Sequence, residues 1–179
     1  MCCTLGTFKA KWCVMKDLQI DDIRISQFLL VERVTGAFGR LVLSCVKADE
    51  LFDCKSNTNY DAIFQKGSKQ FACKLVYSKA LDEWYLESET NPDVRYKIVE
   101  CTDNVAQILK VNDIINYRVD NKYMRFKVLK YFEKYNRFIV LDLNEKEKQI
   151  RHNLSTILKT YKTKNIVSVT TYDEIINKK

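Results

Sequence analysis

The chain has 179 residues, 46% of them hydrophobic and 12% aromatic, which is typical of a folded globular protein and not of a disordered one. It carries 30 Lys and Arg against 23 Asp and Glu, and this net charge of +7 suits a phosphate-rich or acidic partner as well as an ordinary solvated surface. No apolar stretch approaches the ~20 residues of a membrane-spanning helix, and the first residues lack a secretory pattern, so we expect no membrane partner.

Residues 1–65 predict a β-rich N-terminal extension. Residues 7–14 alternate between apolar and polar side chains, which indicates a strand. Residues 23–34 contain a continuous apolar run, expected to be a buried strand, and a glycine-bracketed turn separates them from a second strand at residues 40–46. We therefore expect a hairpin in this region.

Residues 66–110 predict two strands followed by a helix. The preceding domain boundary is expected at residues 55–60 or 65–68, and residues 69–88 hold two apolar runs typical of a hairpin. Asn91 and Pro92 suit the N-cap and first position of a helix. An apolar helix face running to about residue 110 is predicted by spacings of 4, 3, 4 and 3 between Val94, Ile98, Cys101, Val105 and Ile108.

Residues 111–158 predict four short strands, at residues 113–119, 125–131, 137–141 and 148–152. Their alternating side chains and the polar turns between them are typical of a small antiparallel barrel. Closing such a sheet would remove its unpaired edges, which explains how so short a segment can be stable.

The order of features in this segment resembles the core of a Tudor domain. The resemblance is carried by Asn112-Asp113, which opens the first strand, Tyr117 within it, the run Tyr123-Met124-Arg125-Phe126, and Leu143-Asn144-Glu145 after the third strand. Two strands, a helix and such a core are similar to an extended Tudor domain, in which the core is inserted into a split barrel resembling staphylococcal nuclease.

The resemblance implies a mainly β fold with a linking helix (α+β), an SH3-like Tudor barrel attached to a partial OB or staphylococcal-nuclease-like barrel. In this scheme residues 66–110 are the first part of the nuclease-like barrel, and residues 111–158 are the Tudor-like core. Residues 159–179 would supply the returning strand, at residues 166–171, and a C-terminal helix. The first 60 residues have no counterpart that we identify in the family.

Tudor domains of this kind bind methylated arginine or lysine in a cage of aromatic rings, through cation–π attraction. The resemblance places Tyr117 at the first ring, whereas Met124, Val140 and Leu143 stand where further rings are usual, and Glu145 replaces an Asn. We therefore expect a degenerate cage without useful affinity for a methyl mark.

Apolar side chains at cage positions predict a hollow that docks a protein or peptide. Alternatively, Met124, Val140 and Leu143 belong to the barrel interior. The leading hypothesis is a non-catalytic adaptor domain. The resemblance implies a setting in small-RNA silencing, including the piRNA pathway, and in ribonucleoprotein granules, with a cytoplasmic or nuclear location.

The second hypothesis is a basic β-barrel module that binds nucleic acid, with RNA as the partner. Basic residues interleaved with aromatic rings suit single strands, whose bases stack on rings. The candidate contacts are Lys122, Arg125, Lys127, Lys130 and Lys134. Strand alternation weighs against this hypothesis, because half of the rings must then face the core.

We find no catalytic set. His152 is the only histidine, the seven cysteines form no C-x-x-C pair, and no Gly-rich phosphate loop occurs. The sequence therefore predicts no enzyme, no metal, no cofactor and no small-molecule substrate. A viral or host-defence protein with a similar barrel reached by convergence is a third alternative.

Overall fold

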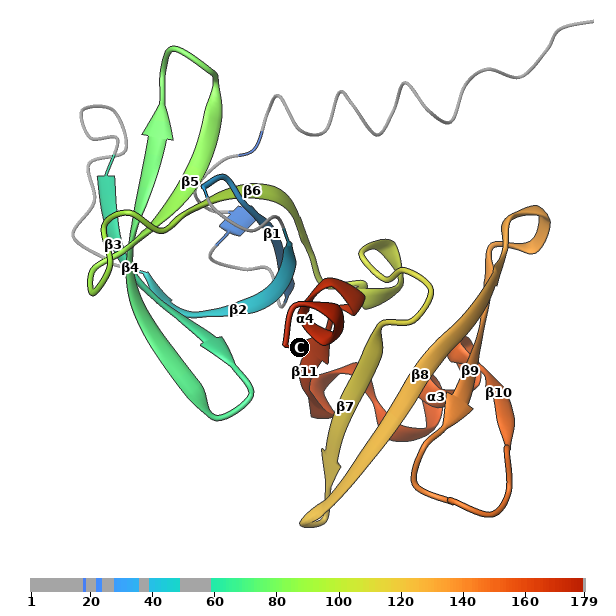
Figure 1. Ribbon diagram of the computed structural model, residues 1–179. Coiled ribbons are helices and arrows are strands. Elements are labelled where there is room, and N and C mark those ends of the chain that lie inside the picture. The colour runs from blue at the N-terminus through green and yellow to red at the C-terminus, as the bar shows by residue number, and fades with distance from the viewer. Residues whose placement is uncertain (1–17, 19–21, 24–27, 36–38, 49–58, 179) are drawn as a thin grey trace, which may run out of the picture.

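The computed structural model describes residues 18, 22–23, 28–35, 39–48 and 59–178. The fold is mainly β, with a closed six-stranded antiparallel barrel, a second sheet of five strands and a few short helices. Figure 1 shows the barrel in blue to yellow-green and the second sheet in yellow to red, with the C-terminal helix α4 between them. The strand expected at residues 7–14 lies outside the described residues.

The barrel is a meander in which each strand pairs with the next and the last pairs with the first. Its strands are β1 (Phe28–Arg33), β2 (Arg40–Ala48), β3 (Asn59–Lys66), β4 (Lys69–Ser78), β5 (Glu83–Ser88) and β6 (Arg95–Thr102). The hairpins expected from residues 23–46 and 69–88 are confirmed, as β1–β2 and β4–β5. Closure leaves no unpaired edge in this sheet.

Strand β1 is apolar on both faces because each face packs in a different hydrophobic core. Leu29 and Val31 point into the barrel interior, whereas Phe28 and Leu30 pack in a second core with residues of the other sheet. Burial on both faces explains the continuous apolar run, since a strand with one solvated face would alternate.

The prediction of a helix over residues 91–110 is wrong, because this segment forms a turn, strand β6 and a short 3₁₀ turn. Asn91 and Pro92 belong to a turn in which the Asn91 side chain accepts a hydrogen bond from the Asp93 backbone at 3.3 Å, and β6 follows. An Asn side chain makes this bond in an Asx turn as readily as at a helix N-cap, so the local signal was ambiguous. Pairing of β6 with both β1 and β5 overrides the helical spacing, and only the 3₁₀ turn η1 (Val105–Gln107) remains.

The boundary expected between residues 65 and 66 falls at the end of β3, beside the turn to β4. Gly67, in the left-handed region at φ +60°, makes this turn between two fully paired strands of the closed barrel. Residues on both sides of the expected boundary therefore belong to one barrel.

The second sheet has the order β10-β9-β8-β7-β11. Its strands are β7 (Ile114–Val119), β8 (Lys122–Phe132), β9 (Arg137–Asp142), β10 (Arg151–Asn153) and β11 (Ile166–Thr170). All four strands expected between residues 111 and 158 are present, the last of them shorter. Asp120 and Asn121 have φ values of 48° and 64°, as the primed turn of a tight β-hairpin requires.

Two expectations about this sheet are wrong. Residues 111–158 do not close by themselves, because β10 is one edge of the sheet and the other edge is β11. The expected returning strand is present as β11, but it pairs with β7 of this sheet and not with the first barrel. The sheet therefore needs residues from beyond the expected Tudor-like core.

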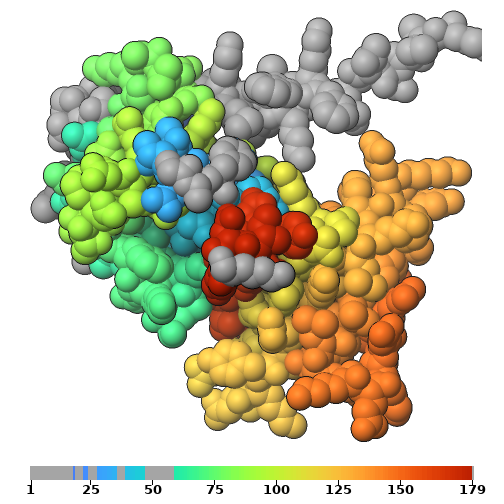
Figure 2. All heavy atoms as spheres, in the orientation of Figure 1, coloured from blue at the N-terminus to red at the C-terminus, as the bar shows by residue number. Residues whose placement is uncertain are grey.

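Two helices complete this part. The helix α3 (Leu154–Tyr161) covers one face of the sheet, where Leu154 and Ile157 share a core with Phe126, Val128 and Val140. Two 3₁₀ turns, η2 (Glu133–Tyr135) and η3 (Thr163–Asn165), lie in connections. The expected C-terminal helix is confirmed as α4 (Tyr172–Ile176), which Thr171 and Glu174 begin with a capping box. Figure 2 shows α4, in red, wedged between the barrel and the second sheet.

Candidate functional site

Tyr117, the expected first cage ring, is fully buried. Its ring centroid lies 5.9 Å from that of Phe126 and 5.8 Å from that of Tyr161, and Phe126 and Tyr161 are 5.7 Å apart. The three rings pack on one another and leave no open pocket between them. The Tyr117 hydroxyl is buried without a hydrogen-bond partner, and burial raises its pKa above the ordinary tyrosine value.

The other cage positions are dispersed. Val140 is fully buried in the same core, and Met124 is partly buried against it. Leu143 is partly buried and Glu145 is exposed. A surface depression of about 280 Å³ is lined by residues 145–148 alone. The structure therefore brings Tyr117, Met124 and Val140 together as core residues and leaves Glu145 outside.

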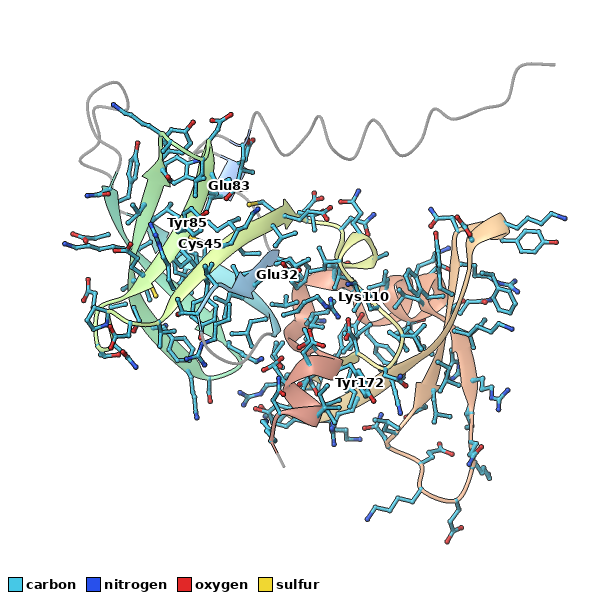
Figure 3. The ribbon with its side chains drawn as sticks, turned by 45° about the horizontal axis from the view of Figure 1, so that its top comes forward. Glu32, Cys45, Glu83, Tyr85, Lys110 and Tyr172 are labelled. Carbon is cyan, nitrogen blue, oxygen red and sulfur yellow. The ribbon has the colours of Figure 1, made fainter. Side chains whose placement is uncertain are left out.

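The opposite face of the second sheet is basic. Strand registers place Arg118 beside Tyr123, Lys127 beside Leu141 and Leu141 beside Arg151, all on the face away from α3. We call this surface the basic face and define its cations as Arg118, Arg125, Lys127, Lys130, Arg137 and Arg151. Figure 3 shows polar side chains, nitrogen-tipped and oxygen-tipped, extending from the orange segment into solvent.

A β-bulge in β8 places the last cations of this strand. Val128 pairs with Val140 in the core, but the next paired residue is Lys130, opposite Ile139. Because the bulge inserts Leu129, Lys130 moves from the inward parity expected of uninterrupted alternation to the outward one. Lys130 and Phe132 thus share the outer face with Arg137.

No cation of the basic face forms an ion pair with a carboxylate in the described part of the chain. The outward positions of β7, β8, β9 and β10 carry no Asp or Glu either. Among described residues, two cations of the barrel behave differently. Arg95 pairs with Glu87, and Lys97 donates to Glu83, whose pKa is lowered chiefly by that hydrogen bond. Carboxylates therefore neutralise Arg95 and Lys97 on the barrel, whereas none pairs with the six cations of the basic face among the described residues.

Two aromatic rings, one exposed and one partly buried, are interleaved with these cations. Tyr123 is 64% exposed, and the Arg118 guanidinium carbon lies 5.5 Å from its ring centroid. At the other end of β8, Phe132 has the Lys130 ammonium 4.7 Å and the Arg137 guanidinium carbon 5.4 Å from its ring centroid. These distances lie within the reach of cation–π attraction.

Sequence reasoning found half of this surface. Arg125, Lys127 and Lys130 lie on the basic face, whereas Lys122 has the opposite strand parity and Lys134 lies in η2, both of them exposed. Sequence reasoning missed the three arginines on neighbouring strands, Arg118, Arg137 and Arg151. Aligning the strands through their turns would have found Arg118, because the two-residue turn fixes the register of β7 against β8.

The described residues contain no group of three His, Cys, Asp or Glu residues placed to hold a metal ion. His152 lies partly buried on β10, opposite Val140. None of the helices formed by these residues is long and apolar enough to cross a membrane.

Comparison with known proteins adds no relative: no family model, no curated protein and no solved structure matches the chain.

Proposed function

We propose that this chain is a non-catalytic binding module that holds the phosphate backbone of a nucleic acid on its basic face. The observation that carries the proposal is the set of six outward cations, Arg118, Arg125, Lys127, Lys130, Arg137 and Arg151, without a carboxylate among them. Sequence-independent binding to nucleic acid rests on such contacts, which release counterions from the phosphates.

The arrangement of the cations supports this ligand more than an ordinary solvated surface. Natural surfaces mix charges of both signs, as the barrel does with Arg95–Glu87 and Lys97–Glu83. A face with one sign of charge over four neighbouring strands gives a positive potential that attracts a polyanion. Exposed rings among the cations suit bases as well as phosphates.

A peptide bound at the cage positions has less support. Tyr117 and Val140 are fully buried, so a ligand there would have to displace core side chains. We therefore assign the contact surface to the opposite face of the sheet and propose RNA, or another nucleic acid, in place of a methylated peptide.

The family assignment is proposed only for the second sheet. Its order, β10-β9-β8-β7-β11, makes the last strand a neighbour of the first and supports an SH3-like unit of Tudor type. The six-stranded meander differs from the five-stranded Greek key of an OB fold. We propose no nuclease-like identity for the barrel.

The test is fluorescence anisotropy with a labelled 12-nucleotide RNA at about 50 mM salt. Changing Arg125→Gln and Lys127→Gln together should weaken binding about tenfold, because both phosphate contacts are lost. The matched control is Lys69→Gln with Lys74→Gln, which removes the same charge from exposed positions on β4 and should leave the affinity within about twofold.

Equal losses in the two double variants would contradict the proposal, since net charge alone would then explain them. So would binding to polyglutamate or to phosphatidylserine vesicles without binding to RNA.

A further inference from the structure

We infer that the ligand of the basic face is a single strand whose bases stack on Tyr123 and Phe132, and this inference rests on the proposed function. The two rings lie near opposite ends of β8 on the outer face, each accompanied by cations. Single-stranded nucleic acid is bound in this way elsewhere, with cations following the backbone and aromatic rings receiving the bases.

The exposure of Tyr123 is the first support. A 64% exposed tyrosine on a sheet face gains little from packing on its own protein, and its ring is available on at least one side. The Arg118 guanidinium lies near the same ring, so a base stacked there would have a cation beside its phosphate. The Tyr123 ring thus offers a surface on which a base can stack, and Arg118 places a positive charge beside it.

Phe132 forms the second position. Its ring is only partly buried, and the Lys130 ammonium of β8 and the Arg137 guanidinium of β9 lie 4.7 Å and 5.4 Å from its centroid. Arg125 and Lys127 occupy the outward positions of β8 between the two rings. The order along the strand is therefore ring, cations, ring.

The length of this arrangement sets the length of the ligand. Tyr123 and Phe132 are nine residues apart in β8, which corresponds to about 30 Å at ~3.3 Å per residue. Stacked nucleotides advance ~3.4 Å each, and extended ones up to about twice as far. The face therefore accommodates about five to nine nucleotides.

The shape of the face favours a single strand over a duplex. Sequence readout of a duplex requires a helix or a ribbon that enters a groove, and the bases of a duplex are already stacked on one another. The basic face is the flank of a sheet, and its two rings stand on that flank near the two ends of β8, each on a residue paired with a neighbouring strand. Rings presented in this way can stack only on bases that are free of a partner. The interaction should also tolerate sequence changes, because every base has a flat face.

The test compares labelled 12-nucleotide oligouridylate with a 12-base-pair RNA duplex, using the whole chain. We expect the single strand to bind at least tenfold more tightly at the same salt concentration. Tyr123→Leu should weaken single-strand binding about fivefold or more and leave duplex binding within twofold. The control is Tyr172→Leu, a tyrosine on α4 that is 43% exposed, which should change neither affinity.

A second readout separates stacking from charge. Tyr123→Leu removes no charge, so the dependence of affinity on salt should keep its slope, whereas Arg125→Gln should make it shallower. Equal affinities for single strand and duplex, or a loss below twofold in Tyr123→Leu, would overturn the inference and leave the proposed function standing. Failure of both RNAs to bind would overturn the proposed function itself.

Discussion

The Nη2 atom of Arg40 lies 2.8 Å and 2.9 Å from the two carboxylate oxygens of Asp113, and both side chains are buried. Arg40 begins β2 of the barrel, and Asp113 immediately precedes β7 of the second sheet. The same carboxylate accepts hydrogen bonds from the backbone N–H groups of Lys110 and Tyr172. One acidic side chain thus joins the barrel, the second sheet and the start of α4.

Asp113→Ala should destabilise the protein by about 3–5 kcal/mol, because it leaves the buried Arg40 guanidinium with only the more distant, partly exposed Asp173 carboxylate as a counter-charge. Urea unfolding measures the change. Asp173→Asn is the comparison, since Asp173 is partly exposed and its carboxylate lies 3.7 Å from Arg40 Nε; it should cost less than about 1 kcal/mol.

A double-mutant cycle with Arg40→Met tests whether the two side chains act as a pair. The double variant should be less destabilised than the sum of the single variants. Additive losses would contradict the account, because they would mean that the ion pair itself contributes nothing.

Tyr117→Phe should stabilise the protein by about 1–2 kcal/mol. The hydroxyl is buried without a partner, so removing it relieves a desolvation cost while the packing against Phe126 and Tyr161 is kept. Thermal or urea unfolding gives the measurement. Destabilisation by a similar amount would show that the hydroxyl has a partner in solution.

Cys73 should react slowly with thiol reagents in the native protein. Burial, with a smaller contribution from Glu89, raises its pKa from 9.0 to about 11, so the reactive thiolate at pH 8 is about 100-fold scarcer than in an unperturbed cysteine. Peptide mapping after brief alkylation should find Cys73 unmodified, whereas alkylation in urea should modify it. Rapid labelling in the native protein would contradict this prediction.

The same shift affects stability at high pH. Because the folded-state pKa lies above the unfolded one, the contribution of Cys73 is complete below pH 9 and is lost as the pH rises towards 11. The stability of the wild type relative to Cys73→Ala should therefore fall across this interval. A constant difference between pH 8 and pH 11 would show that the thiol keeps its ordinary pKa when folded.

Local pattern predicted the second sheet well and the barrel only in part. The strands after residue 111 alternate between apolar and polar side chains and are separated by polar turns. The alternation and the turn residues therefore predict the same strands. Asn91-Pro92 misled because a turn and a helix N-terminus use the same side-chain hydrogen bond. Closure of β6 on β1 is a contact between distant residues that no local signal records.

The candidate site, too, was predictable only where its residues lie in one strand. Arg125 and Lys127 could be placed on one face from their spacing in a single strand, but their arginine neighbours come from other strands. The bulge that turns Lys130 outward has no signature in the sequence. The burial of Tyr117 also depends on Tyr161 of α3, an element that the local pattern did not predict.

The salt dependence of RNA binding tests the central claim most directly. If the six cations of the basic face hold phosphates, the logarithm of the binding constant should fall linearly with the logarithm of salt concentration. Each phosphate contact on a single strand contributes about −0.7 to the slope, so six contacts set a limit of about −4. Arg125→Gln with Lys127→Gln should make the slope shallower by about 1.4, while Lys69→Gln with Lys74→Gln should leave it unchanged. A slope near zero, or the same slope in both double variants, would contradict the account.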